Sequence, residues 1–273
     1  MQTIIIGKRS NLSQHLLSAI DSPVSISASQ AASELASLNW QQSDKVNLIL
    51  NQFQPAAKLN DLSSPIDYVD NAILSTAKIL SSIQSRVAQI NKIIYTSSSS
   101  VYGNNPSCKE TDVPAPISLH ATLKLANEKM VSSFCESHAI DYSIARVFNM
   151  YAGKDQFSII SKIILAAKQD QVINLINQGS AIRDFIHIAD VVHAYQALLS
   201  VSQTKVVNIA SGQGKSVGSI LDYLKQNDII VSTHNIERDE IDVSIADNTT
   251  LLNLIDKPHF RLVEEYVLNE LRL

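Results

Sequence analysis

Short apolar runs alternate with longer amphipathic segments through the first 150 residues. The apolar runs are rich in β-branched residues and predict buried strands at 3–6, 24–27, 45–50, 90–98 and 141–148. The segments between them carry apolar residues at helical spacing and predict helices at 11–20, 30–38, 68–86 and 119–139. Continuous apolar strands separated by helices are typical of a parallel sheet that is covered on both faces. The pattern therefore predicts an α/β protein with a doubly wound parallel sheet.

The strict alternation weakens after about residue 150. The later pattern predicts helices at 158–171, 189–201, 216–226 and 263–273, a strand at 205–211, and a hairpin-like return over 172–188. We expect residues 1–148 plus 183–212 to form a dinucleotide-binding domain. Residues 149–182 plus 213–273 would form a smaller lobe, and the site would lie in the cleft between the two.

The turn between the first strand and the first helix reads "GKRSNLS" and keeps one glycine of a dinucleotide fingerprint, Gly7. Ser10 and Ser13 stand where further glycines would let the backbone approach a pyrophosphate. Lys8 and Arg9 lie beside the expected helix N-terminus, and two cations there favour an anion. The sequence predicts a phosphate-binding turn, and the alternative is a plain strand–turn–helix with a serine cap.

The end of the second strand lacks the carboxylate that binds the ribose 2′-hydroxyl in NAD enzymes. It carries Ser25, Ser27 and Ser29 instead. A missing acid together with an added arginine is typical of a site for a 2′-phosphate, so the pattern predicts NADP, with NAD as the alternative. If Lys8 and Arg9 are simply solvated loop charges, this assignment loses its basis.

Composition narrows the possible partners. The 273 residues are 45% hydrophobic and 18% charged, with a net charge of −4 and no basic block, so we expect no nucleic acid partner. Two cysteines and scattered histidines have no metal-ligand spacing, so no metal site is predicted. No apolar run approaches the roughly 20 residues of a membrane-spanning helix, and the first residues do not resemble a signal peptide. We expect a cytoplasmic protein without a membrane partner.

Five stretches carry a family resemblance, and they occur in the family's order. They are "YTSSSSVYG", "LHATLKLANEKM", "ARVFNMYAG", "RDFIHIADVVHAYQALL" and "VVNIASGQGKSV". Together they resemble the extended short-chain dehydrogenase/reductases, the family of NAD(P)-dependent sugar-nucleotide epimerases, dehydratases and reductases. The resemblance covers nearly the whole chain. It implies a Rossmann-type domain with a smaller C-terminal substrate-binding lobe, a nucleotide-diphosphate sugar as substrate, and a homodimer.

The resemblance also implies roles for individual residues. Ser98, His120 and Lys124 would be catalytic, with Ser98 on the reacting sugar oxygen and Lys124 on the nicotinamide ribose. The cofactor-binding residues would be Gly7, Lys8, Arg9, Ser10, Ser13 and Lys124. The substrate-binding residues would be Ser98, Asn149, Arg183 and Asn208, with Arg183 on the diphosphate.

His120 departs from the family, which has tyrosine at this position of a Tyr-x-x-x-Lys helix. Lys124 follows one helical turn later, and its ammonium disfavours imidazolium, so we expect a neutral imidazole with one N–H to donate. Three interpretations remain open. His120 is the working acid, or it is a bystander while Tyr95, Tyr102 or water donates the proton, or it marks lost activity.

The favoured function is NADP-dependent reduction of a nucleotide-linked 4-keto-6-deoxy sugar for cell-surface polysaccharides. The Gly-x-Arg turn, the modest chain length and the lack of a carboxylate in the tetrad 97–100 favour reduction over dehydration. One alternative is a nucleotide-sugar 4-epimerase with retained NAD. The other is a catalytically inactive protein that binds a nucleotide or nucleotide sugar, because two glycines and the tyrosine are replaced together.

Overall fold

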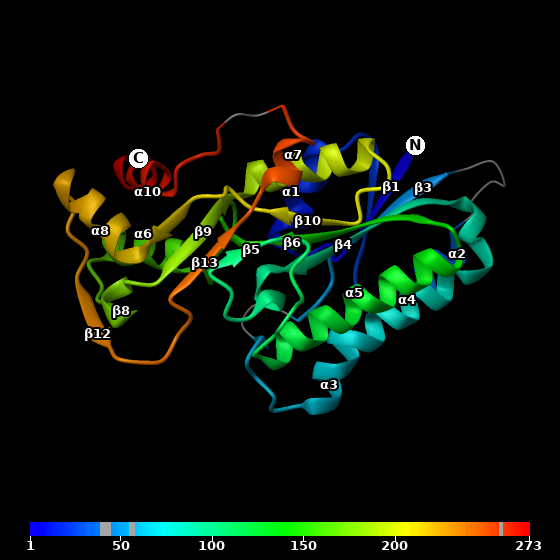
Figure 1. The fold of residues 1–273 in the computed structure, drawn as a ribbon, viewed down its shortest axis with the longest axis horizontal. Coiled ribbons are helices and arrows are strands. Elements are labelled where there is room, and N and C mark those ends of the chain that lie inside the picture. Colours follow the sequence, from blue (N-terminus) through cyan, green and yellow to red (C-terminus); the bar gives the residue numbers. More distant parts are fainter. Residues whose placement is uncertain (39–44, 55–57, 257–258) are drawn as a thin grey trace.

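A parallel sheet of six strands forms the centre of the computed structural model, which describes residues 1–38, 45–54, 58–256 and 259–273. Its strand order is β10-β6-β4-β3-β1-β2, and each neighbouring pair is parallel (Figure 1). The strands are β1 (Gln2–Ile6), β2 (Pro23–Ile26), β3 (Val46–Leu50), β4 (Ile90–Ser98), β6 (Asp141–Val147) and β10 (Val206–Ile209). The order changes direction between β1 and β3, so the doubly wound sheet is confirmed.

Helices cover both faces of this sheet. Alternate strand residues point to opposite faces, so Ile5 packs in one apolar cluster while Ile4 and Ile6 pack in another. The cluster that contains Ile5 includes residues of α1 (Asn11–Ala19) and α7 (Ile188–Ser200). The opposite cluster includes residues of α2 (Ala31–Ser37), α4 (Ser75–Ile83) and α5 (Leu119–Ser137). Figure 1 shows α5 and α4 on one side of the sheet and α7 and α1 on the other.

The segment before β4 is helical throughout but changes its hydrogen-bond pattern. It runs through α3 (Pro65–Val69), the π-helical turn η2 (Asp70–Leu74), α4 and the 3₁₀ segment η3 (Gln84–Gln89). The single helix predicted over 68–86 therefore contains a π turn, a feature that periodicity does not reveal. The carbonyl of Ala72 in this turn accepts a hydrogen bond from Asn127 Nδ2 on α5 at 2.6 Å, which ties α5 to the segment.

The later part of the chain builds a second sheet in the order β11-β9-β13-β5, with β7 paired to β9. These strands are β5 (Ser107–Cys108), β7 (Asn149–Tyr151), β9 (Ile182–His187), β11 (Gly214–Ser216) and β13 (Val243–Ala246). A third, two-stranded sheet pairs β8 (Ile173–Ile176) with β12 (Thr233–Ile236) in parallel. The hairpin predicted over 172–188 is therefore wrong, because β8 pairs with β12 and β9 pairs with β7, β11 and β13, so that β8 and β9 do not pair with each other.

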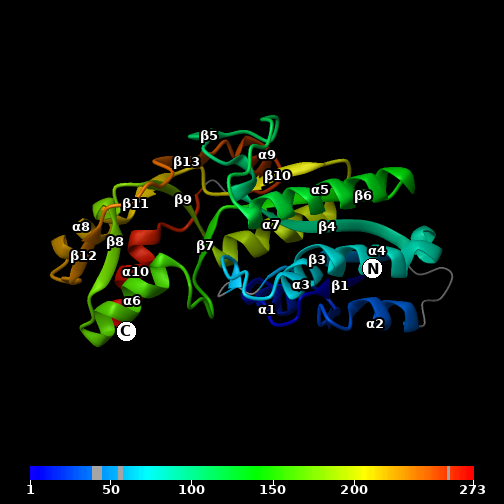
Figure 2. The same cartoon turned by 90° about the horizontal axis from the view of Figure 1, so that it is seen from below.

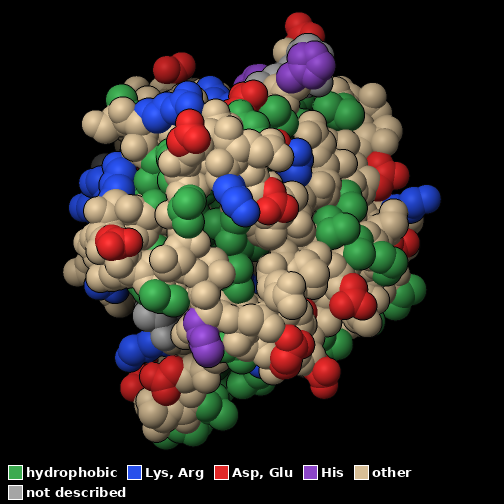
Figure 3. Space-filling model, turned by 90° about the vertical axis from the view of Figure 1, so that its left-hand side faces the viewer, with side chains coloured by type: hydrophobic (Ala, Val, Ile, Leu, Met, Phe, Trp, Pro, Cys, Tyr) green, Lys and Arg blue, Asp and Glu red, His purple; other side chains and the backbone are tan. Residues whose placement is uncertain are grey.

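A smaller lobe lies at one end of the parallel sheet in both Figure 1 and Figure 2. It contains α6 (Ile159–Gln169), α8 (Val217–Gln226) and α10 (Val263–Arg272), with the short elements η5 (Asn177–Gly179) and α9 (Thr249–Leu252) elsewhere in the later chain. Ile163, Ile220 and Val267 of these helices belong to the same buried cluster as Ile5, so one apolar core is continuous from sheet to lobe. Acidic, basic and apolar side chains are interspersed on the lobe's outer face (Figure 3).

Two properties of the described residues bear on partners. Among them, no helix combines the length and the apolar character that crossing a membrane requires. Cys108 and Cys135 are both buried free thiols, and burial raises the pKa of Cys108 to about 11. Both thiols therefore serve as small apolar core residues.

Candidate active site

The cationic turn follows β1 and precedes α1. Gly7 has φ +108°, and a Cβ at this position would clash with the carbonyl oxygen of Asn51. Ser10 is the N-cap of α1 and accepts a hydrogen bond from the Ser13 backbone N–H at 3.0 Å. The other backbone N–H groups of the first helical turn have no intrahelical acceptor, so they form a place for an anion. The side chains of Lys8 and Arg9 are exposed beside them.

The same turn lies against the end of β2. The backbone N–H groups of Gly7 and Lys8 both donate to the carbonyl of Ile26, at 3.0 and 3.2 Å. Ser27 follows and donates its hydroxyl to Gln30 Oε1 at 2.8 Å. The two cations therefore stand beside the strand end that meets the adenosine ribose in dinucleotide-binding sheets, and serine replaces the usual acid there.

Asn51 takes up the two serine hydroxyls of the turn. Its Nδ2 donates to Ser10 Oγ at 2.6 Å and to Ser13 Oγ at 2.9 Å. Ser13 is completely buried, so its side chain braces the turn from inside, and a direct contact with a cofactor stays a prediction. The sequence analysis did not identify Asn51. Its position directly after a buried strand, at the edge of the sheet where ligands bind, is the signal that points to it.

Lys124 lies on α5 and turns its ammonium toward the end of β4. Its Nζ donates to the Thr96 carbonyl at 2.7 Å and lies 4.4 Å from the centroid of the Phe53 ring and 5.1 Å from that of Tyr95. The residue is 9% exposed, and this desolvation lowers its pKa to about 7. Lys124 is therefore held under two aromatic rings. Phe53, a second residue after β3 that the sequence analysis missed, covers it.

His120 lies one turn before Lys124 on the same face of α5. Its Nδ1 is 3.2 Å from Ser118 Oγ, and the ring is half-buried. Burial lowers the pKa of His120 below 6.5, and the Lys124 charge adds a smaller effect in the same direction. A neutral imidazole at pH 7 follows. The predicted influence of Lys124 is present, but desolvation is the larger cause.

Ser98 ends β4 and caps the 3₁₀ turn η4 (Ser99–Tyr102). Its Oγ accepts from the Ser100 backbone N–H at 3.2 Å and from Ser100 Oγ at 3.0 Å. Since both contacts use Ser98 as the acceptor, its own O–H can act as a donor to a ligand. Helix α5 packs on both β4 and η4, so Ser98 and the His120–Lys124 pair share the carboxyl edge of the sheet.

A buried ion pair fixes α5 beneath this edge. Glu128, one turn after Lys124, receives Arg146 Nε at 3.1 Å on Oε1 and Nη2 at 2.8 Å on Oε2. Ser97 also donates to Glu128 Oε1, at 2.5 Å. Both charged side chains are about 5% exposed, so each depends on the other for compensation. The pair therefore sets the position of the helix that carries His120 and Lys124.

The two tyrosines considered as substitute acids are inside the protein. Tyr95 is completely buried, and desolvation raises its pKa far above the ordinary value. Tyr102 is 2% exposed, its pKa is raised to about 12 by burial, and its hydroxyl donates to Asn208 Oδ1 at 2.6 Å. Neither phenol gives up a proton readily at neutral pH. His120 is thus the better placed titratable group.

Asn208 does not reach a substrate, although the resemblance placed it near the nucleotide. It is completely buried, and its Nδ2 donates to the carbonyls of Cys108 and Asp247 at 3.0 and 3.1 Å. Because Tyr102 occupies its oxygen as well, the whole amide is used to join β10 to the second sheet. Asn208, which was predicted to bind substrate, thus links β10 to the second sheet inside the protein.

Asn149 and Arg183, which were predicted to bind the substrate, lie on the paired strands β7 and β9. Asn149 Nδ2 donates to the carbonyl of Asp184 at 2.9 Å, which leaves its amide oxygen for other partners. Arg183 pairs with Glu240, with Nη2 3.1 Å from Oε2. Glu240 also lines a cavity of about 820 Å³ whose other lining residues are Asn177, Glu237, Arg238, Asp239 and Asp242. The structure therefore places Arg183 beside an open but acidic cavity.

The turn after β1 suits the phosphates of a dinucleotide as it stands, whereas the surroundings of Lys124 would suit the nicotinamide end only after a side chain moves. The turn offers backbone N–H groups, Gly7 and two exposed cations, which is a donor set for phosphates. At the other end, the Phe53 ring covers the Lys124 ammonium and would have to move before Lys124 could bind a nicotinamide ribose, as predicted. Among the described residues, no group of three or more acidic, histidine or cysteine side chains is arranged to hold a metal ion.

Known proteins match this chain in sequence. A family model described as "NAD dependent epimerase/dehydratase family" matches residues 27–210. The chain is 30% identical over 161 residues to Protein CapI of Staphylococcus aureus, covering 57% of this chain and 47% of that protein. It is 26% identical over 170 residues to UDP-glucuronate 4-epimerase of Thermodesulfobacterium geofontis, covering 60% and 52%. The chain thus spans about half the length of these relatives.

Solved structures share the fold at lower identity. MoeE5 in complex with UDP-glucose and NAD superposes with a TM-score of 0.83 at 20% identity, covering 100% of this chain and 98% of that one. UDP-glucuronic acid 4-epimerase from Bacillus cereus, in complex with UDP-glucuronic acid and NAD, gives 0.82 at 18% identity, covering 100% and 98%. The Rossmann-type fold is confirmed. Because the family model matches more than half of the sequence, the chain belongs to the NAD-dependent epimerase/dehydratase family.

Proposed function

We propose that this protein catalyses the NADP-dependent reduction of a nucleotide-linked 4-keto-6-deoxyhexose, in the formation of sugars for cell-surface polysaccharides. The observation that carries the proposal is the pairing of His120 and Lys124 on one face of α5, next to Ser98 at the carboxyl edge of β4. Such edges of parallel sheets are where ligands bind. A protein that kept only the fold would have no need for these three side chains together.

Each of the three side chains has a distinct task. Ser98 donates its O–H to the C4 carbonyl oxygen and polarises it. The imidazolium form of His120 delivers the proton that this oxygen needs when the carbonyl becomes an alcohol, and the neutral imidazole remains. Lys124 holds the ribose hydroxyls, while burial, with a smaller effect from the Lys124 charge, keeps the pKa of His120 low. A bound nicotinamide would supply the hydride.

The NADP form is supported by the cationic turn. Arg9 and Lys8 stand beside the end of β2, where a serine replaces the acid that a 2′-hydroxyl would need. An exposed guanidinium suits a phosphate because it donates two parallel hydrogen bonds. The two structures compared above are complexes with NAD, so cofactor choice is a point on which this chain would differ from them.

Two other functions each have an observation in their favour. The names of several relatives and structural neighbours favour a UDP-sugar 4-epimerase with retained NAD. The Phe53 ring over the Lys124 ammonium favours a protein that binds a nucleotide sugar without redox chemistry. The reductase is preferred because the cationic turn and the His120–Lys124 pair both have a use in it.

One experiment separates the three functions. Purified protein is mixed with NADPH and with 4-keto-6-deoxyhexoses linked to UDP, GDP or dTDP, and loss of NADPH absorbance is followed. We expect turnover with one of these substrates, and we expect His120→Phe to abolish it while NADPH binding stays unchanged. Release of NAD from the denatured protein, together with interconversion of UDP-hexoses, would identify an epimerase. Absence of both activities, with nucleotide-sugar binding retained, would identify the binding protein.

A further inference from the structure

Arg183 is already engaged in an ion pair inside the protein. Its Nη2 lies 3.1 Å from Glu240 Oε2, and its Nη1 donates to the carbonyl of Ile182 at 2.9 Å. The two charged side chains are 21% and 19% exposed, so water screens the pair only in part. The guanidinium that the proposed function assigns to the substrate diphosphate therefore has an anionic partner of its own.

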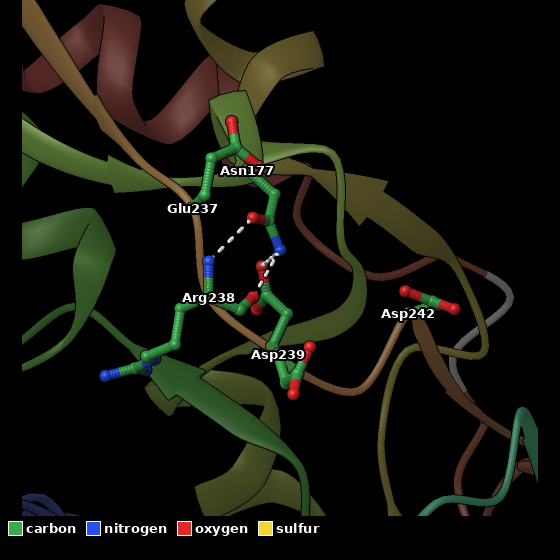
Figure 4. Close-up of a pocket in the computed structure, with 6 residues that line it drawn as sticks. Asn177, Glu237, Arg238, Asp239 and Asp242 are labelled. Carbon is green, nitrogen blue, oxygen red and sulfur yellow. Dashed lines mark hydrogen bonds between the residues drawn. The ribbon is translucent and has the colours of Figure 1, made fainter.

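The cavity beside this pair is acidic. Glu237, Asp239, Glu240 and Asp242 line it, and Arg238 is the cation among its lining residues. The side chain of Arg238 extends away from Asp239 and Asp242, so it does not lie between them (Figure 4). The residues described contain no acidic cluster arranged for a metal ion that would neutralise these charges. A diphosphate that enters the cavity thus meets carboxylates before it reaches Arg183.

The backbone of this acidic segment is anchored, whereas the Glu240 side chain has room to move. Asn177 Nδ2 donates to the Arg238 carbonyl at 2.7 Å, and the Arg238 N–H donates to Asn177 Oδ1 at 3.1 Å (Figure 4). Beyond its bond to Arg183, Glu240 accepts a long contact of 3.5 Å from Asn177. A rotation of the Glu240 side chain into the cavity would free Arg183 without moving the strands.

We propose that Glu240 occupies the anion site of Arg183 and that a nucleoside diphosphate binds by displacing it. The inference rests on the proposed function, because it takes Arg183 as the residue that meets the diphosphate. A bidentate diphosphate–guanidinium contact replaces the carboxylate, and Glu240 turns into the open cavity. The internal pair therefore lowers the affinity for every diphosphate and favours ligands that offer more than one negative oxygen to Arg183.

Isosteric neutralisation of the carboxylate tests this competition. The probes are UDP, GDP and dTDP, titrated into the full chain by isothermal calorimetry. Glu240→Gln removes the competing charge and should tighten binding of the preferred diphosphate on the order of tenfold, the scale of a partly screened ion pair. Asp239→Asn is the matched control, because Asp239 lines the same cavity and is exposed, whereas the ion pair of Arg183 is with Glu240. The control should change binding less than twofold or so.

The binding results for the variants can overturn the displacement of Glu240 in two ways. Equal tightening in Glu240→Gln and Asp239→Asn would show that only the cavity's total charge matters, which overturns the inference. Weaker binding in Glu240→Gln would show that Glu240 orients Arg183, which also overturns the inference.

Arg183→Ala separates the displacement inference from the proposed function. If this change leaves binding intact, the diphosphate site of the proposed function is wrong. If Arg183→Ala abolishes binding while Glu240→Gln has no effect, only the displacement inference fails. Binding of no diphosphate to either protein would overturn both.

Discussion

Replacing Lys124 by methionine tests whether its amine is as strongly desolvated as the structure indicates. The residue is 9% exposed, and its pKa is lowered from 10.5 to about 7 by desolvation. Methionine has a similar length and cannot titrate, so it keeps the packing under Phe53 and Tyr95. A comparison of the two proteins at several pH values therefore isolates the proton of Lys124.

The direction in which the free energy of unfolding changes with pH follows from the protons that the folded and unfolded chains bind. Between pH 7 and pH 9 the unfolded chain keeps the lysine proton while the folded chain releases it, so the free energy of unfolding increases with pH. A folded pKa of about 7 and an unfolded pKa of 10.5 give an increase of about 2 kcal/mol across this interval. The contribution is lost again as the pH falls through the folded pKa. The Thr96 carbonyl and the two rings favour the ammonium, so about 2 kcal/mol is an upper limit.

Urea unfolding at pH 7, 8 and 9 measures this difference. The free energy of unfolding of the natural protein, minus that of Lys124→Met, should rise with pH by about 1–2 kcal/mol. Lys129→Met is the control, because Lys129 lies on the same helix and is exposed. A difference that stays constant across the three pH values, or that equals the control's, would show that Lys124 keeps an ordinary pKa and that the buried environment assigned to it is wrong.

Three further predictions address the cofactor and the acid. Phe53→Ala removes the ring that lies 4.4 Å from Lys124 Nζ, so it should tighten NADPH binding roughly fivefold to tenfold, measured by fluorescence titration; unchanged or weaker binding would show that the ring does not compete with the cofactor. Arg9→Ala should weaken NADPH binding about tenfold or more and NADH binding far less, and equal losses would discard the 2′-phosphate site. Because the pKa of His120 lies below 6.5, the imidazolium fraction and the rate of ketone reduction should rise as the pH falls toward 6. His120→Tyr should remove this acidic limb of the pH–rate profile, and a limb that persists would assign the proton to another group.

The fold could be predicted because its signals are local. The strands at 3–6, 46–50, 90–98 and 141–147 fall on short segments rich in apolar and β-branched residues, which is the pattern that a strand buried on both faces favours. The hairpin over 172–188 was wrong for the opposite reason. Its two strands are real, but β8 finds its partner in β12, some 60 residues later, and the strand pattern alone does not choose between partners.

Contacts within one helix of the site could be predicted from the sequence, whereas contacts between distant segments could not. His120 and Lys124 could be placed together because a four-residue spacing on a helix fixes their relative position. Phe53 and Glu240 could not be found in this way. Phe53 and Lys124 are 71 residues apart in the sequence. Glu240 and Arg183 are 57 residues apart. Each contact therefore depends on tertiary packing. Asn208 shows the converse, since a motif residue expected at the substrate is used to tie two sheets.

Phe53 and Glu240 each contact a cation that is predicted to bind a ligand. Each gives a cation that should meet a ligand an internal partner, an aromatic ring for Lys124 and a carboxylate for Arg183. A buried cation without a partner is costly, so such contacts stabilise the protein when no ligand is bound. They also reduce affinity, because the ligand must replace them. A protein that had lost its ligands would gain from making these contacts deeply buried and permanent. Here the Phe53 ring is partly exposed and Glu240 lines an open cavity, so both partners can be displaced. The exposure of these two contacts favours a site that is closed until its ligands arrive over one that has been filled for good.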